Sequence, residues 1–278
     1  MKAGDHSLGG ADLIVKTAPI WGVTHANMVM RKILITGASS GLGAALARNY
    51  ARNDASGGVE LVLWGRDQTR LDAVAVECRA LGAACHSDAF DLRDVDGMLA
   101  RLASLGRVEL AIFCAGVGGS VPDSQASESA AAARVTAEVN FVGPVAGASA
   151  MAEAMAERGR GQIVLVGSIA ESFPLPMAPS YAASKAGLAL FAEALGIRMA
   201  RHGVTVSLVS PGFIDTPMSQ GLTQPKPFLM SADHAAAIIA RAIARGQKRI
   251  VVPWQFIGLR GFAMMLPRAW LRAILGRL

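Results

Sequence analysis

The feature that most constrains the fold is a glycine-rich turn between a short apolar run and a helical stretch. The apolar run is Ile33-Leu34-Ile35, the turn is Thr36-Gly37-Ala38-Ser39-Ser40-Gly41-Leu42-Gly43, and residues 44–50 are helical in composition. Glycines let a backbone turn tightly and approach a pyrophosphate, whose charge the amides and dipole of a helix N-terminus stabilise. An ordinary tight turn would also use glycines. The position of this turn, after a strand and before a helix, favours phosphate binding.

The alternation of apolar strands with helical stretches continues to residue 252. Parallel strands need crossover connections, so this alternation implies a parallel sheet with helices on both faces. The sequence therefore predicts an α/β, doubly wound fold with a seven-stranded parallel sheet. The first strand is expected to begin near Arg31, and the others to cover residues 59–64, 84–90, 110–113, 162–166, 204–209 and 249–252. The six helices are expected over residues 44–50, 67–81, 95–104, 126–157, 180–201 and 232–244.

The chain divides into one large domain and two flanking segments. Residues 1–30 lack sustained periodicity and are expected to form a flexible N-terminal extension. Residues 31–253 carry the strand and helix alternation, and residues 254–278 form a basic C-terminal segment. No internal repeat or domain-sized linker interrupts the central part, so we expect a single catalytic domain.

Composition narrows the class of protein. Apolar residues make up 52% and charged residues 17% of the 278 residues, so the chain can bury a sizeable core and is too apolar for general disorder. The net charge of +6 permits nucleotides, nucleic acid or a lipid surface as partners. The sequence has no basic helix with interleaved aromatic residues, so nucleic acid is not expected to be a partner.

Cysteine and histidine usage gives no sign of a disulfide scaffold or a metal site. Cys78, Cys85 and Cys114 form no CxxC motif and cannot all be paired, which favours a reducing, cytoplasmic compartment. The five histidines are scattered singly, without the spacing that metal ligands show. No uncharged apolar run reaches the ~18 residues that a membrane-spanning helix needs.

Two residues with complementary chemistry stand four positions apart on one expected helix. They are Tyr181 and Lys185, in the segment Ser180-Tyr-Ala-Ala-Ser-Lys185, and this spacing places both on one helix face. A nearby ammonium stabilises tyrosinate and lowers the pKa of the phenol from about 10, which makes it a better acid/base near neutrality. The same spacing also occurs where a tyrosine packs its ring and a lysine is solvated, so it needs supporting residues.

Those supporting residues are present in order along the chain. Ser168 follows the expected strand 162–166, Asn140 lies within the long helix 126–157, and Pro211-Gly212-Phe213-Ile214-Asp215-Thr216 follows another strand. Together with the glycine turn, they resemble the short-chain dehydrogenase/reductase family in its compact, single-domain form, from about Arg31 to Pro253. The resemblance implies a Rossmann fold and an oxidoreductase that uses a nicotinamide cofactor.

The resemblance also implies a role for each matching residue. Tyr181 matches the catalytic acid/base, Lys185 the residue that lowers its pKa and holds the nicotinamide ribose, and Ser168 the residue that hydrogen-bonds the substrate oxygen. Asn140 matches the fourth catalytic residue, a member of the proton relay. Each has a plainer alternative in isolation: Ser168 as a strand-end cap, Asn140 as a polar residue inside a helix and Thr216 as a turn residue. The predicted cofactor-binding residues are Gly37, Ser39, Ser40, Gly41, Leu42, Gly43, Arg66, Asp91, Leu92, Ala115, Gly116, Tyr181, Lys185, Pro211, Gly212, Ile214 and Thr216.

Within that set, the resemblance places Asp91-Leu92 at the adenine and the segment from Pro211 to Thr216 at the carboxamide. The chain has Cys114-Ala115-Gly116 where the family usually has Asn-Ala-Gly, preceded by Phe113 in place of a further asparagine. The side chains that normally tie this loop to neighbouring strands are therefore missing, and Cys114 is expected to be a small buried hydrophobe.

The end of the second strand predicts a preference for NADP(H) over NAD(H). An acidic residue at this place would hydrogen-bond the ribose 2′-hydroxyl, but the chain has Gly65 followed by Arg66. Glycine removes a carboxylate that would repel a 2′-phosphate, and the guanidinium can pair with that phosphate. The alternative is that Arg66 only caps the neighbouring helix.

Two apolar segments are expected to converge on the substrate. One, between Thr216 and the helix at 232–244, contains Met218, Leu222, Phe228, Leu229 and Met230, and the other, after Ser168, contains Phe173, Leu175, Pro176 and Met177. Pockets lined in this way accept apolar or amphipathic molecules. The alternative is that some of these side chains pack against the sheet or against a second subunit and do not contact a substrate.

The resulting hypothesis is an NADP(H)-dependent oxidoreductase that transfers hydride between the cofactor and a carbonyl or alcohol of a lipophilic small molecule. A 3-oxoacyl-thioester reductase of fatty-acid type is the alternative among enzymes, and a nucleotide-sensing binding protein without turnover is the alternative from another class. The helices that contain Asn140 and Tyr181 resemble those that form the interface of family dimers and tetramers, so a homodimer or homotetramer is expected.

The C-terminal segment 254–278 allows two interpretations. It carries Arg260, Arg268, Arg272 and Arg277 without an acidic residue, and an apolar stripe follows Pro267. Such a basic amphipathic helix can lie on an anionic membrane surface as a peripheral attachment. It can equally dock on the domain or on a partner subunit, and both interpretations stay open.

Overall fold

The computed structural model describes residues 30–53, 58–121, 125–222 and 225–258, together with Met1 and Gly261. Seven parallel strands form one sheet in the order β3-β2-β1-β4-β5-β6-β9. Its strands are β1 (Arg31–Thr36), β2 (Val59–Gly65), β3 (Ala84–Ala89), β4 (Leu110–Phe113), β5 (Gly161–Val166), β6 (Val204–Pro211) and β9 (Arg249–Val252). The helices that connect them are α1 (Gly41–Asn53), α2 (Gln68–Ala80), α3 (Val95–Ser104), α4 (Ala130–Ala137), α5 (Gly143–Glu157), α6 (Pro179–Met199) and α8 (Ala232–Ala244).

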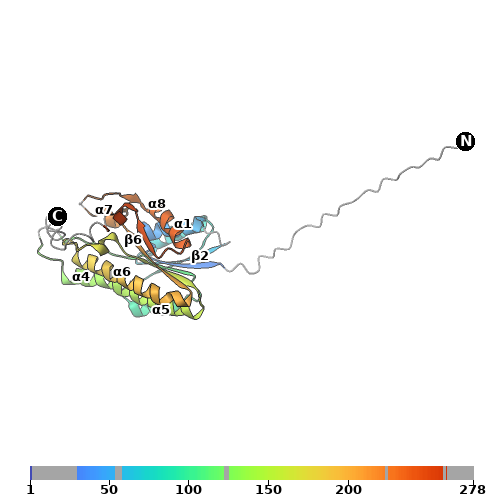
Figure 1. Ribbon diagram of the computed structural model, residues 1–278, viewed down its shortest axis with the longest axis horizontal. Helices are drawn as coiled ribbons and strands as arrows, with labels where there is room; N and C mark the ends of the chain where they lie inside the picture. Colours follow the sequence, from blue (N-terminus) through green and yellow to red (C-terminus); the bar gives the residue numbers. More distant parts are fainter. Residues whose placement is uncertain (2–29, 54–57, 122–124, 223–224, 259–260, 262–278) are drawn as a thin grey trace.

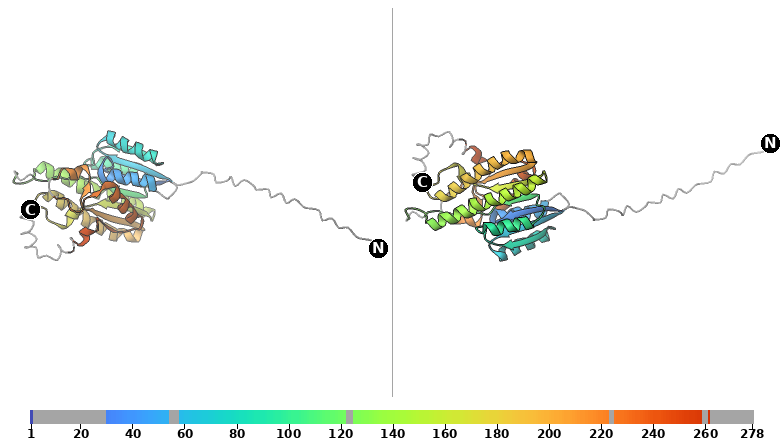
Figure 2. Two further views of the ribbon diagram at one scale, coloured as in Figure 1. Left: turned by 90° about the horizontal axis from the view of Figure 1, so that it is seen from above. Right: turned by 90° about the horizontal axis from the view of Figure 1, so that it is seen from below.

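The helices form a layer on each face of the sheet. Helices α1, α2 and α8 lie side by side on one face, and α3, α5 and α6 lie on the other (Figures 1 and 2). This arrangement confirms the predicted doubly wound fold. The chain proceeds from β1 outward to β2 and β3 and then returns to place β4 on the other side of β1. The strand order therefore reverses between β1 and β4, and in open α/β sheets ligands bind at the carboxyl ends of the strands where the order reverses.

Local sequence signals set several helix boundaries. Asp67 accepts a hydrogen bond from the amide of Arg70 and so caps α2, at 3.0 Å. Asp94 caps α3 in the same way through the amide of Gly97, also at 3.0 Å. A side-chain oxygen at this position satisfies one of the free amides of the first turn. The predicted bounds of α3, β4, α8 and β9 agree with the structure.

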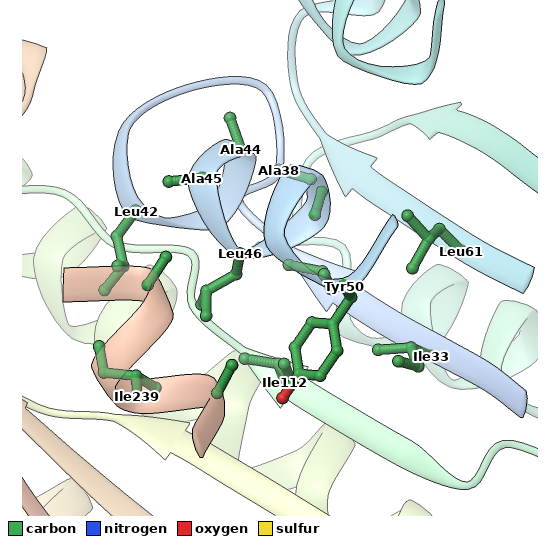
Figure 3. Close-up of a cluster of buried hydrophobic side chains, with 14 of the residues drawn as sticks. Ile33, Ala38, Leu42, Ala44, Ala45, Leu46, Tyr50, Leu61, Ile112 and Ile239 are labelled. Carbon is green, nitrogen blue, oxygen red and sulfur yellow. The ribbon is translucent and has the colours of Figure 1, made fainter. Parts of the chain in front are cut away.

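The core on one face of the sheet fixes α1 and α8 against the strands. Ile33 and Ile112 of the sheet, Leu46 of α1 and Ile239 of α8 are fully buried, and Figure 3 shows them packed together. Burying apolar side chains of this size contributes about 1.5–3 kcal/mol each. The packing therefore holds the N-terminus of α1, and the glycine turn that precedes it, in a fixed position at the carboxyl end of β1.

The predicted helix over 126–157 differs from the structure in two ways. It begins at Ala130, because the Ser129 hydroxyl accepts from the amide of Ala132 and caps α4. It is also interrupted by a π-helical segment, Glu138–Val142, between α4 and α5. Such π segments inside helices are frequent at functional sites, and this one contains Asn140.

Three further elements are present beyond those predicted from sequence. Strands β7 (Ile214–Asp215) and β8 (Met230–Ser231) pair in parallel as a separate small sheet. Between them lies the short helix α7 (Pro217–Gln220). Helix α7 and strand β8 belong to the apolar segment between Thr216 and α8 that is predicted to approach the substrate.

Most of the two flanking segments lies outside the described residues. This applies to residues 2–29 of the N-terminal extension and to residues 259–260 and 262–278 of the basic C-terminal segment. Among the residues that the structure describes, no helix is both long and apolar enough to cross a membrane.

Candidate active site

The glycine turn after β1 forms a cradle of bare backbone. Gly37 has a φ of +72°, and a Cβ on it would lie 2.7 Å from the Cα of Ala115. A Cβ on Gly43 would lie 2.3 Å from the carbonyl oxygen of Gly37. Neither position accommodates a side chain, because the obstructing atoms are backbone. The turn therefore brings the amides at the start of α1 next to the loop after β4, as a phosphate-binding turn requires.

The other predicted residues of this turn differ in what their side chains face. Leu42 belongs to the hydrophobic core, so only its backbone is available to a cofactor. Ser39 lies against the end of β2, since a Cβ on Gly65 would be 3.2 Å from its hydroxyl oxygen. Ser40 accepts a hydrogen bond from the amide of Ala44 through its carbonyl, at 3.2 Å, which starts α1.

The loop after β4 is held by a residue that the sequence analysis did not assign. The hydroxyl of Thr36, at the end of β1, accepts from the amides of Cys114 and Ala115 at 3.1 Å each. This hydroxyl ties the loop to the neighbouring strand although the family's asparagine side chains are missing. Gly116 follows. A Cβ on it would lie 3.3 Å from the Oδ1 of Asn140 and 3.6 Å from the Nζ of Lys185.

Asn140 anchors the same loop from the π-helical segment. It is fully buried. Its Oδ1 accepts from the amide of Val117 and its Nδ2 donates to the carbonyl of Val117, both at 2.8 Å. Its Nδ2 is also 3.5 Å from the hydroxyl of Ser184 on α6. Asn140 therefore joins the loop after β4 to the helix that carries Tyr181 and Lys185.

Ser168 and Tyr181 come together at the carboxyl end of β5. Ser168 caps the 3₁₀ turn Ile169–Ser172, accepting from the amide of Ala170 at 3.2 Å. Tyr181 lies in the first turn of α6, and Ser168 is close enough to its phenol to lower the pKa of that phenol. Glu128 fixes the start of α6 by accepting from the amide of Ser180 at 2.8 Å. Ser168 is thus held by its own bond to the 3₁₀ turn, and Tyr181 by the helix start that Glu128 fixes.

Lys185 is buried one helical turn beyond Tyr181. It is 4% exposed, and its Nζ donates to the carbonyl of Val166 at 2.9 Å. The same Nζ lies 5.9 Å from the centroid of the Tyr181 ring. Burial lowers the pKa of Lys185 to about 8, against the opposing effects of Cys114 and Glu171. The lysine therefore stands at the edge of the cradle with a proton that it loses at mildly alkaline pH.

The pKa of Tyr181 differs from the expectation. Burial raises this pKa, the hydrogen bond with Ser168 lowers it, and the negative charge of Glu171 raises it further. The main effects on this pKa therefore come from burial, Ser168 and Glu171, and not from Lys185 as the sequence predicts. In the structure its ammonium donates to a backbone carbonyl, and desolvation of the phenol dominates.

The predicted adenosine-binding residues lie together at the ends of β2 and β3. Arg66 is exposed, and Asp91 accepts from the Nε and Nη2 of Arg93 at 2.9 and 2.6 Å. Hydrogen bonds from Arg93 lower the pKa of Asp91, and the charge of Arg66 lowers it further. Leu92 is buried, with its carbonyl against Gly143 of α5. Arg66 and Asp91 are therefore close enough to interact electrostatically.

The segment after β6 completes the cradle. Gly212 donates its amide to the carbonyl of Val252 at 2.7 Å after Pro211 has ended β6, and Ile214 is buried in β7. Thr216 caps α7 in a capping box with Ser219. A Cβ on Gly41 would lie 3.1 Å from the Cγ2 of Thr216. The segment predicted to hold the carboxamide thus meets the glycine turn.

Sequence reasoning missed four residues that build this site: Thr36, Glu128, Glu171 and Ser184. Thr36 and Ser184 stand within the two quoted motifs, and Glu171 is three residues after Ser168. Their roles could not be assigned from sequence because they depend on contacts in the folded chain. Across the part of the chain that is described, no group of three or more His, Cys, Asp or Glu side chains is arranged to hold a metal ion.

Comparisons with known proteins agree with this geometry. The family model of the short chain dehydrogenases matches residues 31–227. An uncharacterized oxidoreductase of Myxococcus xanthus is 34% identical over 257 residues, covering 91% of this chain and 99% of that protein. A short-chain dehydrogenase from Sphingobium yanoikuyae in complex with NADPH is similar in structure, with a TM-score of 0.75 and 27% identity over 84% of this chain and 94% of that one.

A further solved structure has a more specific title. It is the bulky-bulky ketone specific alcohol dehydrogenase from Comamonas testosteroni, with a TM-score of 0.71 and 25% identity over 89% of this chain and 92% of that one. The family match covers more than half of the chain, and the bacterial relative is matched over almost its whole length. The chain therefore belongs to the short-chain dehydrogenase family and is an oxidoreductase of that type.

Proposed function

We propose that the protein is an NADP(H)-dependent carbonyl reductase or alcohol dehydrogenase for lipophilic substrates. The observation that carries this proposal is the meeting of Ser168, Tyr181 and Lys185 beside the glycine cradle. A phenol that bonds a serine hydroxyl, with a buried ammonium one turn away, can exchange a proton with an oxygen atom at the same place.

The residues present fit a dinucleotide cofactor. Gly37 and Gly43 leave bare backbone at the N-terminus of α1, as a pyrophosphate requires. Lys185 Nζ lies 3.6 Å from the position of a Cβ on Gly116, so its ammonium can reach a ribose placed over that glycine. The bound nicotinamide would supply or accept the hydride. Asp91 and Leu92 would contact the adenine, and the Pro211–Thr216 segment the carboxamide.

The side chains of the protein would handle the oxygen and its proton. Ser168 would donate a hydrogen bond to the substrate oxygen and so polarise the carbonyl. Tyr181 would deliver a proton to that oxygen during reduction and remove one during oxidation. Lys185 would stabilise negative charge on the phenol, and Asn140 would keep the loop at Val117 in register with α6.

Preference for NADP(H) depends on Arg66 in this proposal. Arg66 is exposed and follows Gly65, where a Cβ would lie 3.2 Å from the Ser39 hydroxyl, so its guanidinium can pair with a 2′-phosphate bound beside this glycine. We expect Arg66→Ala to lower kcat/KM for NADPH by about 10- to 100-fold and to change that for NADH little, since a charge-assisted contact contributes about 1.5–3 kcal/mol. Steady-state kinetics with both cofactors measure this. Arg70→Ala, an exposed arginine of α2, is the control, and an unchanged cofactor preference in Arg66→Ala would overturn the assignment.

A lipophilic substrate is proposed from exposed apolar side chains in the segment between Thr216 and α8. Met218, Phe228 and Leu229 are each about half exposed, and Met218 lies against Gly118 of the loop after β4. The Comamonas testosteroni enzyme, which is named for bulky-bulky ketones, supports the same substrate class. NADPH oxidation should be measured with a panel of bulky ketones and of 3-oxoacyl thioesters. Turnover of thioesters alone would replace the ketone proposal, and no turnover of any carbonyl would refute the reductase.

Self-association through α6 is part of the proposal. Leu190 and Ile197 on this helix are 71% and 75% exposed, an unfavourable state for two aliphatic side chains on one helix. We expect a homodimer or homotetramer in sedimentation velocity. The double variant Leu190→Glu/Ile197→Glu should sediment as a smaller species, because it places charges in the interface. A monomeric parent protein would contradict this.

A further inference from the structure

An ion pair with a buried carboxylate, between Glu171 and Arg249, lies beside the turn that carries Ser168. Glu171 is in the 3₁₀ turn Ile169–Ser172, and its side chain is only 3% exposed. It forms a salt bridge with Arg249, the first residue of β9. Its Oε1 also accepts from the hydroxyl of Ser210 near the end of β6, at 3.0 Å. One carboxylate thus links the catalytic turn to two strands of the sheet.

The carboxylate also lies close to the backbone of Gly167, the residue before Ser168. A Cβ on Gly167 would lie 2.7 Å from the Oε2 of Glu171, and the amide of Gly167 donates to the carbonyl of Val209 at 2.7 Å. A small cavity beside the pair is lined in part by Ile169, Phe173 and Phe256. These apolar walls leave Glu171 in surroundings of low dielectric, where its charge acts strongly on neighbouring groups.

We propose that Glu171, held by Arg249 and Ser210, is a positioning residue of the active site: it fixes the turn that carries Ser168 and places a negative charge beside the Tyr181 phenol. This inference rests on the proposed role of Tyr181 as the acid/base. A buried pair of this kind contributes little stability beyond that of apolar residues of similar volume. The function that we assign to the pair is therefore its effect on the pKa of Tyr181, the proposed proton donor.

The charged and titratable groups around the phenol come from several elements. The Nζ of Lys185, on α6, lies 5.9 Å from the centroid of the Tyr181 ring. The charge of Glu171, in the 3₁₀ turn, acts on the pKa of both groups, and Cys114, just after β4, acts on the pKa of Lys185. Arg249 faces Glu171 from β9. The negative charge of Glu171 raises the pKa of both Tyr181 and Lys185.

Near neutral pH the effect on Lys185 favours its charged form, whereas Tyr181 is protonated there with or without the charge of Glu171. Reduction needs a protonated phenol as acid and a charged lysine, and Glu171 stabilises both of these protonated forms. Oxidation needs the phenolate as base, and Glu171 makes that form rarer. The alkoxide formed from a carbonyl is a far stronger base than tyrosinate, so a raised phenol pKa still permits proton delivery.

The composition of the chain allows a direct test, because it contains only two tyrosines, Tyr50 and Tyr181. In a Tyr50→Phe background, the ultraviolet absorbance of tyrosinate reports Tyr181 alone, and Tyr50→Phe/Tyr181→Phe is the blank. We expect Glu171→Gln in this background to lower the titration midpoint by about one pH unit, a tenfold change in proton affinity. Glu193→Gln, which removes an exposed carboxylate from α6, should leave the midpoint unchanged.

The double variant Glu171→Gln/Arg249→Gln covers the case in which Glu171→Gln does not fold. It leaves no uncompensated cation beside the buried turn, and its midpoint should also fall, because Glu171 is the member of the pair whose charge raises the pKa of Tyr181. An unchanged midpoint in a folded variant would overturn the proposal. The titration needs neither substrate nor cofactor, so its result is independent of whether the protein turns over a carbonyl.

Discussion

Tyr181→Phe is expected to lower kcat/KM for carbonyl reduction by about 10³-fold, the order of magnitude that general acid catalysis contributes. The substitution removes one hydroxyl and almost no volume, so α6 and its Ser180–Glu128 cap should keep their geometry. NADPH should still bind, because the backbone cradle at Gly37 and Gly43 does not involve the phenol. Binding measured by NADPH fluorescence, together with steady-state rates, separates the two effects.

Tyr50→Phe provides the matched control for this variant. Tyr50 is the only other tyrosine of the chain and packs in the core between α1 and the sheet (Figure 3). The control should turn over substrate at the rate of the parent. If Tyr181→Phe were as active as the parent protein, Tyr181 would not be the proton donor, and the proposed mechanism would have to be abandoned.

The sequence predicted the architecture well because its signals are local. Strands β4 and β9 are short apolar runs, and Asp94 caps α3 where the sequence places its start. The glycine turn is also recognisable from the sequence. The structure explains its glycines, because a side chain at Gly37 or Gly43 would collide with backbone atoms. Local chemistry of this kind needs no knowledge of the rest of the fold.

The elements that the sequence did not predict depend on distant contacts. The π-helical segment at Asn140 has no distinctive composition, and what holds it is the pairing of the Asn140 amide with Val117, 23 residues away. Strands β7 and β8 are two residues long, too short to show a periodicity. Their pairing depends on the chain returning to the same place after α7.

The electrostatics of the site were the least predictable part. The spacing of Tyr181 and Lys185 predicts that the lysine lowers the pKa of the phenol, but burial and Glu171 raise it. Glu171 acquires its position through Arg249, 78 residues further along the chain. A pKa depends on desolvation and on all nearby charges, and these are set by tertiary structure.

Lys185→Met is expected to lower kcat/KM by about 100-fold and to weaken NADPH binding by about tenfold, since a hydrogen bond from a charged group contributes about 1.5–3 kcal/mol. The ammonium lies at the edge of the cradle, 3.6 Å from the position of a Cβ on Gly116. Methionine keeps the length of the side chain and removes the charge. Lys248→Met, at an exposed lysine, should change neither quantity.

The pH dependence of NADPH binding distinguishes loss of this charge from a change in shape. The pKa of Lys185 is lowered to about 8 in the folded protein from 10.5, so the lysine is charged below that pH and loses its proton as the pH rises through it. The affinity of the parent for NADPH should therefore fall as the pH rises above about 8. Isothermal titration at several pH values should show this fall in the parent and in Lys248→Met, but not in Lys185→Met.

The stability of Lys185→Met separates a functional loss from misfolding. The unfolded chain binds the lysine proton more tightly than the folded one, so the buried charge destabilises the fold below pH 8, and this cost declines as the pH rises toward 10.5. The shift corresponds to about 3 kcal/mol at neutral pH, whereas the lost bond to Val166 contributes about 1 kcal/mol. Lys185→Met should therefore be at least as stable as the parent in denaturant unfolding at neutral pH. Parent-like NADPH affinity and turnover in this stable variant would show that the ammonium does not act on cofactor or phenol.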